Sequence, residues 1–324
     1  MYISLDTYAT ETITDNVIQP FQLESSHLRG RIVRLGSVLD DILGSHQYPA
    51  LVNQLLGETV TMCALLSSML KYEGVFTLQT QGDGPIPMLI SDMTTSGDVR
   101  GCATFSVERL EHAAEQLAAF ERKNGIADNQ FAQLLGKGYI AFTVDQGGPE
   151  GRYQGIVELK GASLVDCVQH YFSQSEQIGT GIVMAVGQRE GKWRAQGIML
   201  QIMPEENEAK GRESGNLHED DWRRAMILMQ SVTENELLDP ALTPHTILTR
   251  LFHEEGVRVY EPQEVKKSCR CSREKVESML LMMPEDDREY MEEKGKIVLT
   301  CEFCGTDYEF DRQEIEKKIR KKSS

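Results

Sequence analysis

The sequence predicts an α+β fold: an antiparallel-sheet N-terminal domain with packed helices, a helical linker and a small C-terminal module. Strand-like runs follow one another after Glu73 with short turns between them, which favours antiparallel pairing. A polar segment with almost no apolar side chains begins at Glu205 and cannot bury a core of its own. Four of the seven cysteines then fall in the stretch from Cys269 to Cys304. These observations separate a folded body from a linker and a distinct tail.

Three parts are expected, with residues 1–204 forming the N-terminal core, 205–261 a linker with two amphipathic helices, and 262–324 the C-terminal module. A chain of 324 residues, of which 40% are apolar, can bury a substantial core, and its length corresponds to roughly two domains. One larger domain with a smaller appendage is therefore expected.

The N-terminal core is predicted to begin with a helical layer. From Val38 to Tyr72 apolar residues recur mainly at helical spacing, with Pro49 near a helix start. Two further helices are predicted at 107–119 and 164–172. Strand-like runs are found at 75–79, 98–107, 138–145, 152–159, 181–187 and 192–203.

The linker is predicted to contain a mobile segment and two helices. The mobile segment is 205–216, where too little apolar surface is available to offset the entropy of ordering. Thr243 and Pro244 suit the N-cap and first turn of the second helix, which runs to about Glu254. The first helix is expected at 220–232, with apolar residues on one side: Trp222, Ala225, Met226 and Met229, widened by Leu228 and Val232.

Charge and composition exclude several classes of function. The formal net charge of −16 opposes binding to nucleic acid or an anionic membrane, because each needs a basic surface. Met1 to Pro20 shows no basic start followed by an apolar stretch, and no uncharged apolar run approaches the roughly 20 residues that cross a bilayer. We therefore expect a cytoplasmic protein. In reducing cytosol, clustered cysteines indicate metal or redox chemistry before structural disulfides.

Four cysteines form a specific metal-binding pattern. Cys269 and Cys271 make a C-x-C pair, and Cys301 and Cys304 a C-x-x-C pair, with 29 residues between the pairs. Four sulfur ligands suit tetrahedral Zn²⁺, and they leave no open position for a catalytic water. Gly305 gives the backbone freedom expected at such a turn. The sequence therefore predicts one Zn²⁺ bound by these four cysteines in a C-terminal zinc-binding module.

This zinc has two interpretations, one purely structural and one regulatory. A module of about 60 residues has a small core, and structural zinc contributes about 10 to 16 kcal/mol to folding, so loss of the metal should unfold it. Thiolates are also oxidisable, and Cys301 and Cys304 can close a disulfide more easily than Cys269 and Cys271, which are separated by a single residue. Basic residues crowd the first pair: Lys266, Lys267, Arg270, Arg273 and Lys275. They either promote thiolate reactivity or form a solvated face that offsets the charge of the zinc tetrathiolate.

The remaining features favour neither an enzyme nor further reactive thiols. Cys63, Cys102 and Cys167 lie among apolar neighbours and are expected to be buried and inert. The sequence contains no P-loop, H-E-x-x-H or G-x-S-x-G motif, and the segment 82–85 is expected to be a hairpin turn. No catalytic residue is assigned. The main alternative function is a zinc-ribbon protein that binds nucleic acid or regulates, with a purely structural zinc; the acidic body argues against it.

Several motifs resemble the heat shock protein 33 family of redox-regulated bacterial chaperones, with coverage from about Asp15 to about Phe310. These motifs lie along the whole chain: 81–85, 152–157, 171–172 with 175–177, 199–204, 250–255, 269–274 and 301–305. Three features depart from the family pattern: a leading segment before Asp15, a longer stretch at 121–131, and Gln196 where a second glycine before Gly197 is expected.

The resemblance implies an ATP-independent holdase that binds unfolding client proteins in the stress response. Reduced and zinc-bound, it is inactive; the four ligands are also the redox-switch cysteines. On oxidation the Cys301–Cys304 pair responds first, the zinc leaves, the C-terminal module and linker helices lose structure, and the protein tends to form a homodimer through its N-terminal domain. Independently, release of the linker helices would uncover the sheet against which they pack. Their exposed stripe makes Trp222, Met226 and Met229 the candidate client-binding residues.

Overall fold

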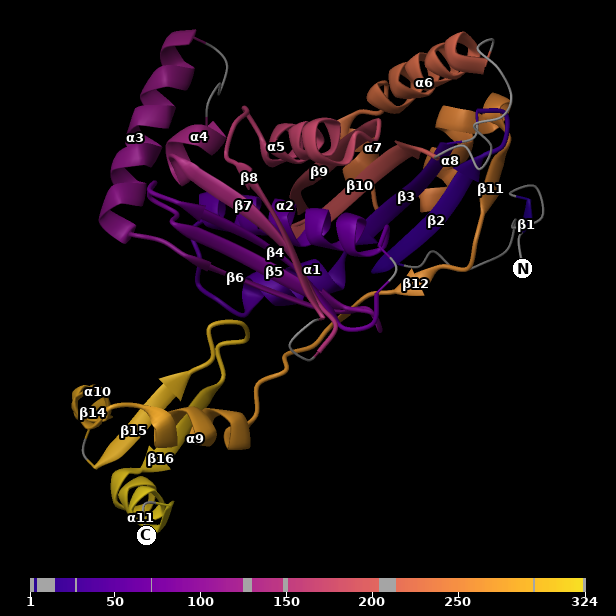
Figure 1. Cartoon of the computed structure of the whole chain (residues 1–324). Helices are drawn as coiled ribbons and strands as arrows, with labels where there is room; N and C mark the ends of the chain where they lie inside the picture. Colours follow the sequence, from indigo (N-terminus) through magenta and orange to yellow (C-terminus); the bar gives the residue numbers. More distant parts are fainter. Residues whose placement is uncertain are drawn as a thin grey trace. The chain divides into compact units, whose positions relative to one another are not determined.

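The structure is a computed structural model that describes residues 3–4, 15–26, 28–70, 72–124, 130–147, 151–203, 214–293 and 295–322. It is an α+β protein (Figure 1), which confirms the predicted class. Two compact units are found, Met1–Lys267 and Ser268–Ser324.

The first sheet of unit 1 is antiparallel, in the order β1, β11, β2, β3, β10, β9, with β12 paired to β2. Its strands come from both ends of the unit. The bounds are β1 Ile3–Ser4, β2 Val17–Leu23, β3 Leu28–Leu35, β9 Thr180–Arg189, β10 Lys192–Ile202, β11 Val257–Val259 and β12 Gln263–Glu264.

This sheet is covered on both faces, and the strand period of two separates the faces. Val33 in β3 and Met199 in β10 belong to the larger core cluster, together with residues of helix α2. Ile32 and Ile198, which are Cα partners in the two strands, belong to a second cluster with the helices of the linker. The sheet therefore has a body face, toward α2, and a linker face, toward the linker helices.

The second sheet has the order β13, β6, β5, β4, β7, β8, and all its pairs are antiparallel except β13 with β6. The turn at 82–85 connects β4 to β5, as predicted. The bounds are β4 Val75–Gly82, β5 Met88–Thr94, β6 Asp98–Thr104, β7 Gly138–Asp145, β8 Arg152–Glu158 and β13 Lys266–Lys267.

Helix α2 (Ala50–Ser67) contacts strands of both sheets and forms the centre of the larger core. It is also long and apolar enough to cross a membrane by length and composition, but 72% of that stretch is buried within the fold. Such burial is typical of a core helix. The other helices of the body are α1 Ser37–Gly44, α3 Val107–Asn124, α4 Gln130–Leu135, α5 Leu164–Tyr171 and the π-helix η2 Phe172–Glu176.

The linker helices pack on the linker face of the first sheet. They are α6 Ser214–Gln230, α7 Glu234–Leu238 and α8 Pro244–Phe252, followed by the short 3₁₀ helix η3 His253–Glu255. The Thr243 side chain caps α8 by accepting from the backbone of Thr246, with Pro244 in the first turn, as predicted. Helix α7 begins with a capping box between Thr233 and Glu236.

The predicted elements agree with the structure in position, with differences at their ends. Residues 205–213 of the predicted mobile segment lie outside the described residues. Helix α6 begins at Ser214, earlier than the predicted start at Asp220. The prediction depended on apolar spacing, and a polar first turn gives no such signal.

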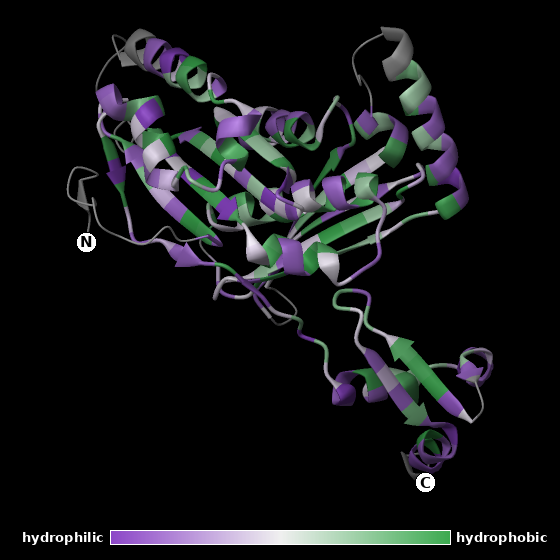
Figure 2. Cartoon of the chain, turned by 180° about the vertical axis from the view of Figure 1, so that it is seen from behind, coloured by the Kyte–Doolittle hydropathy of each residue, from purple (hydrophilic) through white to green (hydrophobic). Residues whose placement is uncertain are grey.

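Unit 2 is a small module around a three-stranded antiparallel sheet, β14–β15–β16. Figure 2 shows β15 as mainly hydrophobic and β16 as mainly hydrophilic. The core consists of Leu280, Ile297, Phe310 and Ile315. The element bounds are α9 Arg273–Met282, α10 Glu285–Tyr290, β14 Glu292–Glu293, β15 Lys296–Thr300, β16 Asp307–Asp311 and α11 Arg312–Lys322.

Candidate functional site

The four predicted ligands come from two turns of unit 2. Cys269 and Cys271 lie just before α9, whose N-cap Ser272 accepts a hydrogen bond from the backbone of Lys275. Cys301 and Cys304 lie in the turn that joins β15 to β16. A helix start and a hairpin turn thus each present one pair of sulfur atoms.

The four sulfur atoms form one cluster and all lie within 4.8 Å of one another. Two contacts connect the pairs: Cys269 Sγ is 3.7 Å from Cys301 Sγ, and Cys271 Sγ is 3.5 Å from Cys304 Sγ. A tetrahedron with Zn–S bonds of about 2.3 Å has S···S edges of about 3.8 Å. The donor set and the spacing of the sulfurs therefore fit one Zn²⁺ ion.

The turn between Cys301 and Cys304 is shaped by its own backbone. The Cys301 N–H donates to the Thr306 carbonyl at 2.9 Å, and the Gly305 N–H donates back to the Cys301 carbonyl at 2.8 Å. Gly305 has φ of 67°, in the left-handed region, as its position after the second pair suggested. These backbone hydrogen bonds fix the turn that carries the sulfurs of Cys301 and Cys304, so its shape does not depend on a large core.

Two polar groups outside the four ligands contact the cluster. The Tyr308 hydroxyl donates to Cys271 Sγ at 3.1 Å, and the Thr306 hydroxyl lies 3.2 Å from Cys304 Sγ. Neither residue was predicted from the sequence. The register of the β15–β16 hairpin could have indicated the contact of Tyr308. Tyr308 is the Cα partner of Leu299, which shortly precedes Cys301, so Tyr308 lies near the cysteines.

The thiols differ in how readily they give up a proton. Burial raises the pKa of Cys271 to about 12, against the hydrogen bond from Tyr308. Burial also raises the pKa of Cys301. At Cys304 burial acts in the same direction, but hydrogen bonds from Thr306 and the neighbouring thiols outweigh it and lower the pKa to about 6. The thiolate is therefore favoured at Cys304 and disfavoured at Cys271 and Cys301.

The basic residues near the first pair have structural contacts. The Arg273 guanidinium lies 4.4 Å from the centre of the Phe310 ring and donates to the Glu309 carbonyl. Lys275 donates to the Arg270 carbonyl at 2.8 Å, and Lys266 pairs with Glu264 at 2.9 Å. Lys267 donates to the Asp41 carbonyl at 2.8 Å. These four basic residues thus have structural partners, and an effect on thiolate reactivity stays a prediction.

The other cysteines are buried in unit 1, as predicted. Burial raises the pKa of Cys63 to about 12 and that of Cys167 to about 11. Cys102 is 3% exposed. Thiols of this kind react slowly with oxidants, because the thiolate is the reactive species.

The candidate client-binding residues lie on one side of α6, where they cover the linker face. Ala225 and Met229 are fully buried there, and Trp222 and Met226 are partly buried against the same cluster. Glycine at position 181 of β9 permits this approach, since a Cβ there would meet Met226 Sδ at 2.2 Å. The predicted apolar stripe is therefore confirmed as a packing surface, and its role toward clients stays a prediction.

Comparisons with known proteins agree with this architecture. The family model for Hsp33 protein matches residues 16–311. The chain is 37% identical to a 33 kDa chaperonin of Caulobacter vibrioides over 92% of this chain and 96% of that protein. It is 33% identical to a 33 kDa chaperonin of Aliivibrio fischeri, over 94% and 95%. The crystal structure of the 33 kDa chaperonin of Thermotoga maritima has the same fold, with a TM-score of 0.76, 23% identity, and coverage of 96% and 99%. The chain belongs to the Hsp33 family.

Proposed function

We propose that this protein is a redox-regulated, ATP-independent molecular chaperone that binds unfolding proteins and prevents their aggregation under oxidative stress. The reduced form holds one Zn²⁺ on Cys269, Cys271, Cys301 and Cys304 and is inactive. Membership of a family whose relatives are named chaperonins supports the chaperone part. The observation that carries the switch is the cluster of four sulfurs within 4.8 Å in a module with a very small core.

Because the core of the C-terminal module is small, the module would stay folded only while the metal is bound. Four buried apolar side chains cannot supply the free energy that a domain needs, whereas structural zinc supplies about 10 to 16 kcal/mol in small modules. Oxidation of the four cysteines to two disulfides transfers four electrons and four protons to two molecules of peroxide, which become four molecules of water. No thiolate is then left for the metal. We infer that the Cys301–Cys304 bond forms first. Loss of zinc then unfolds the module.

The linker transmits this unfolding in our proposal. We divide the chain functionally into a core (1–204), a linker (205–261) and a redox-switch module (262–324). The strap from β12 to β13 joins the two sheets of unit 1 immediately before the first cysteine pair, and Val265 between these strands is 1% exposed. The strap belongs to the redox-switch module as divided here, so unfolding of the whole module would detach the strap from both sheets. The linker helices would then leave, and their stripe at Trp222, Met226 and Met229 would become available to clients.

The proposal includes partners and location. The protein acts in the cytoplasm on unfolded or unfolding clients, forms a homodimer on oxidation, has no catalytic activity, and uses neither nucleic acid nor a membrane as a partner. The net charge of −16 supports the last point, because polyanions are repelled by such a chain.

One sample tested by three measurements distinguishes the switch from a structural zinc. The reduced, zinc-loaded protein is treated with peroxide at mild warming. Zinc release, free thiols and the light scattering of a heat-unfolding client are then recorded together. We expect zinc and thiols to be lost before client aggregation is suppressed, with no suppression by the reduced protein. Equal suppression before and after oxidation would show that the zinc has only a structural role.

A further inference from the structure

A polar spot lies on the otherwise apolar linker face, beneath the connector between α7 and α8. Arg34 in β3 and Gln196 in β10 are Cα partners, and each shares its face with apolar residues of the second core cluster. Arg34 is 2% exposed and Gln196 is 1% exposed. Two polar side chains are thus buried side by side where the packing would favour apolar ones.

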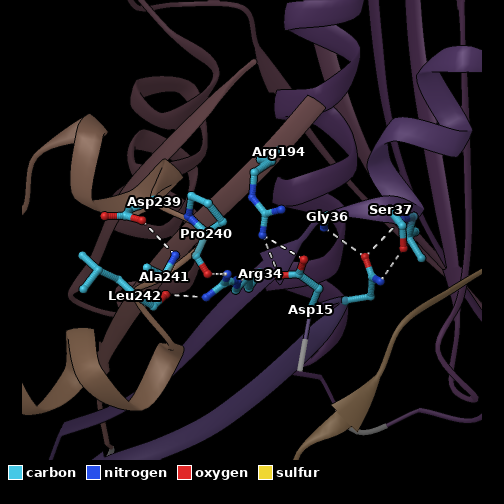
Figure 3. Close-up of polar contacts among 11 residues, drawn as sticks. Asp15, Arg34, Gly36, Ser37, Arg194, Asp239, Pro240, Ala241 and Leu242 are labelled. Atoms are coloured by element: carbon cyan, nitrogen blue, oxygen red, sulfur yellow. Dashed lines mark hydrogen bonds and ion pairs between the residues drawn. The ribbon is translucent and has the colours of Figure 1, made fainter. Parts of the chain in front are cut away.

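The Arg34 guanidinium binds main-chain carbonyl groups of the linker (Figure 3). Its Nη2 donates to the Pro240 carbonyl at 2.7 Å, and its Nη1 donates to the Leu242 carbonyl. Its Nε donates to Asp15 Oδ1 at 2.6 Å, and Asp15 also accepts from Arg194 at 2.7 Å. The carboxylate thus offsets the buried charge, and the remaining donors of the planar fork bind peptide groups.

Both hydrogen bonds from Arg34 to the linker go to main-chain carbonyls, and the Asp239 side chain adds only an electrostatic attraction. The two carbonyl groups lie two residues apart on one chain, on either side of Ala241, whose N–H donates to the Asp239 side chain. Carbonyl groups with this spacing occur in every polypeptide. A surface that binds them accepts many sequences, as a binder of unfolded proteins must.

Gln196 differs from Arg34 because the Gln196 side-chain amide makes no hydrogen bond to the described residues while the linker is docked. Within the described part of the chain, neither its side-chain nitrogen nor its side-chain oxygen has a hydrogen-bond partner. Ala185, the Cα partner of Gln196 in β9, is 7% exposed and offers no polar side chain. A buried amide without partners destabilises the closed state, and a peptide group, with one donor and one acceptor, would satisfy it.

We propose that Arg34 and Gln196 form a subsite for the polypeptide main chain, which the Pro240–Leu242 connector occupies in the resting protein and a segment of an unfolded client occupies after the linker has left. The linker is then an internal mimic of a client. Ile32 and Ile198, the next pair along the same face, would receive an apolar side chain of that segment. This inference rests on the proposed release of the linker.

A synthetic peptide of residues 232–252, which contains α7, the connector and α8, is the probe. It carries a fluorophore, and its binding to the full-length protein is followed by anisotropy. We expect binding to the oxidised protein and none to the reduced protein, in which the connector fills the subsite. Arg34→Gln should weaken binding to the oxidised protein about tenfold or more, because hydrogen bonds to a charged donor are lost.

Arg31→Gln is the matched control. Arg31 lies in the same strand on the body face, and its guanidinium also donates to main-chain carbonyls, those of Gly30 and Ser68. We expect this variant to bind the probe as the wild type does. An equal loss in both variants, or no loss with Arg34→Gln, would overturn the proposal.

Altered probes test main-chain recognition with the protein unchanged. A thioamide at Leu242 weakens the carbonyl acceptor and should reduce affinity, whereas a thioamide at Ala241 should not, since Arg34 contacts the carbonyls on either side of it. Equal affinities of the two probes would contradict the proposal even if Arg34 variants fail to fold.

Gln196→Met separates a binding role from a packing role. Replacing the unpaired amide by an apolar side chain should stabilise the docked linker and likewise tighten binding of the linker probe. It should yet weaken binding of a labelled unfolded peptide unrelated to the linker, by about fivefold in the oxidised protein. Hydrogen exchange in α8 reports independently whether the linker has left. If α8 stays protected after oxidation, the proposed function fails together with this inference. If α8 is released and Gln196→Met binds the unrelated peptide as tightly as the wild type, the role of Gln196 fails.

Discussion

Arg224 in α6 and Glu255 in η3 form an ion pair with two hydrogen bonds, from Nε to Oε1 at 2.6 Å and from Nη2 to Oε2 at 3.0 Å. Glu255 is 4% exposed and also accepts from the Ser25 hydroxyl in the turn between β2 and β3. One carboxylate therefore ties the first linker helix to the turn that joins two strands of the first sheet. This contact is independent of the zinc module, and its loss should loosen the linker directly.

Glu255→Gln should release α6 at lower stress than in the wild type. The variant keeps the shape of the side chain but loses the charge, and hydrogen bonds to charged groups are worth about 2 kcal/mol. We expect partial suppression of client aggregation without oxidant while zinc stays bound. The control is Glu254→Gln, because Glu254 is the adjacent residue and its side chain is 86% exposed. Full zinc retention and no activity in Glu255→Gln would show that this pair does not hold the linker.

The same pair predicts a pH dependence of linker docking. The hydrogen bond from Arg224 lowers the pKa of Glu255 from its ordinary value of 4.5, against the effect of burial. A depressed pKa in the folded state stabilises docking above pH 4.5, and this contribution is lost as the pH falls through the folded value. The difference in α6 hydrogen exchange between wild type and Glu255→Gln should therefore shrink as the pH falls below 4.5 and vanish below the lowered pKa of Glu255. A constant difference across that range would contradict this linkage.

Local patterns predicted much of the fold and the candidate site. The cap at Thr243, the strand from Gly138 to Asp145 and the stripe on α6 each follow from neighbouring residues, so the sequence contains their signals. The four cysteines were assigned by spacing and lie in one cluster. Features encoded within a few residues were thus accessible.

Features that depend on distant partners were not accessible. Strand β2 contains Pro20, and β3 carries three arginines, so neither shows a simple alternation of apolar and polar residues. Arg34 can be buried because its guanidinium binds the carbonyls of Pro240 and Leu242. These partners lie 206 and 208 residues away in the sequence. Nothing near Arg34 in the sequence indicates that contact. Tyr308 was missed for a similar reason, since its role follows from the register of a hairpin.

Gly181→Ala should weaken the docking of α6. The added Cβ would lie 2.2 Å from Met226 Sδ and 3.0 Å from Met229 Cε, so both side chains must move. Overpacking of this kind costs about 1 to 3 kcal/mol, and the flexible methionines favour the lower end. We expect a lower oxidant threshold for chaperone activity. Gly44→Ala is the control, because a Cβ added there would have nothing within 4 Å and the methyl group is tolerated; equal thresholds for the two variants would refute the packing argument.

Tyr308→Phe should lower the affinity for zinc and speed its release by peroxide. The hydroxyl donates to Cys271 Sγ and stabilises negative charge on that sulfur. Removing a group that hydrogen-bonds to a metal ligand typically lowers the affinity for the metal about tenfold or more. Competition with a chromophoric chelator measures the effect. Tyr290→Phe, in the same module at a side chain 93% exposed, should behave as the wild type. The same affinity in both variants would remove Tyr308 from the site.

Cys301→Ser tests whether the metal itself is the lock. A serine hydroxyl is a poor zinc ligand at neutral pH, so three sulfurs remain and the metal is held weakly. Because the core of the module is so small, we expect it to unfold in part and the reduced variant to suppress client aggregation without oxidant. The control is Glu302→Ser, an exposed position between the two ligands of the same turn, which should retain zinc and stay inactive. A Cys301→Ser protein that loses its zinc and remains as inactive as the control would mean that metal loss and activation are separate events.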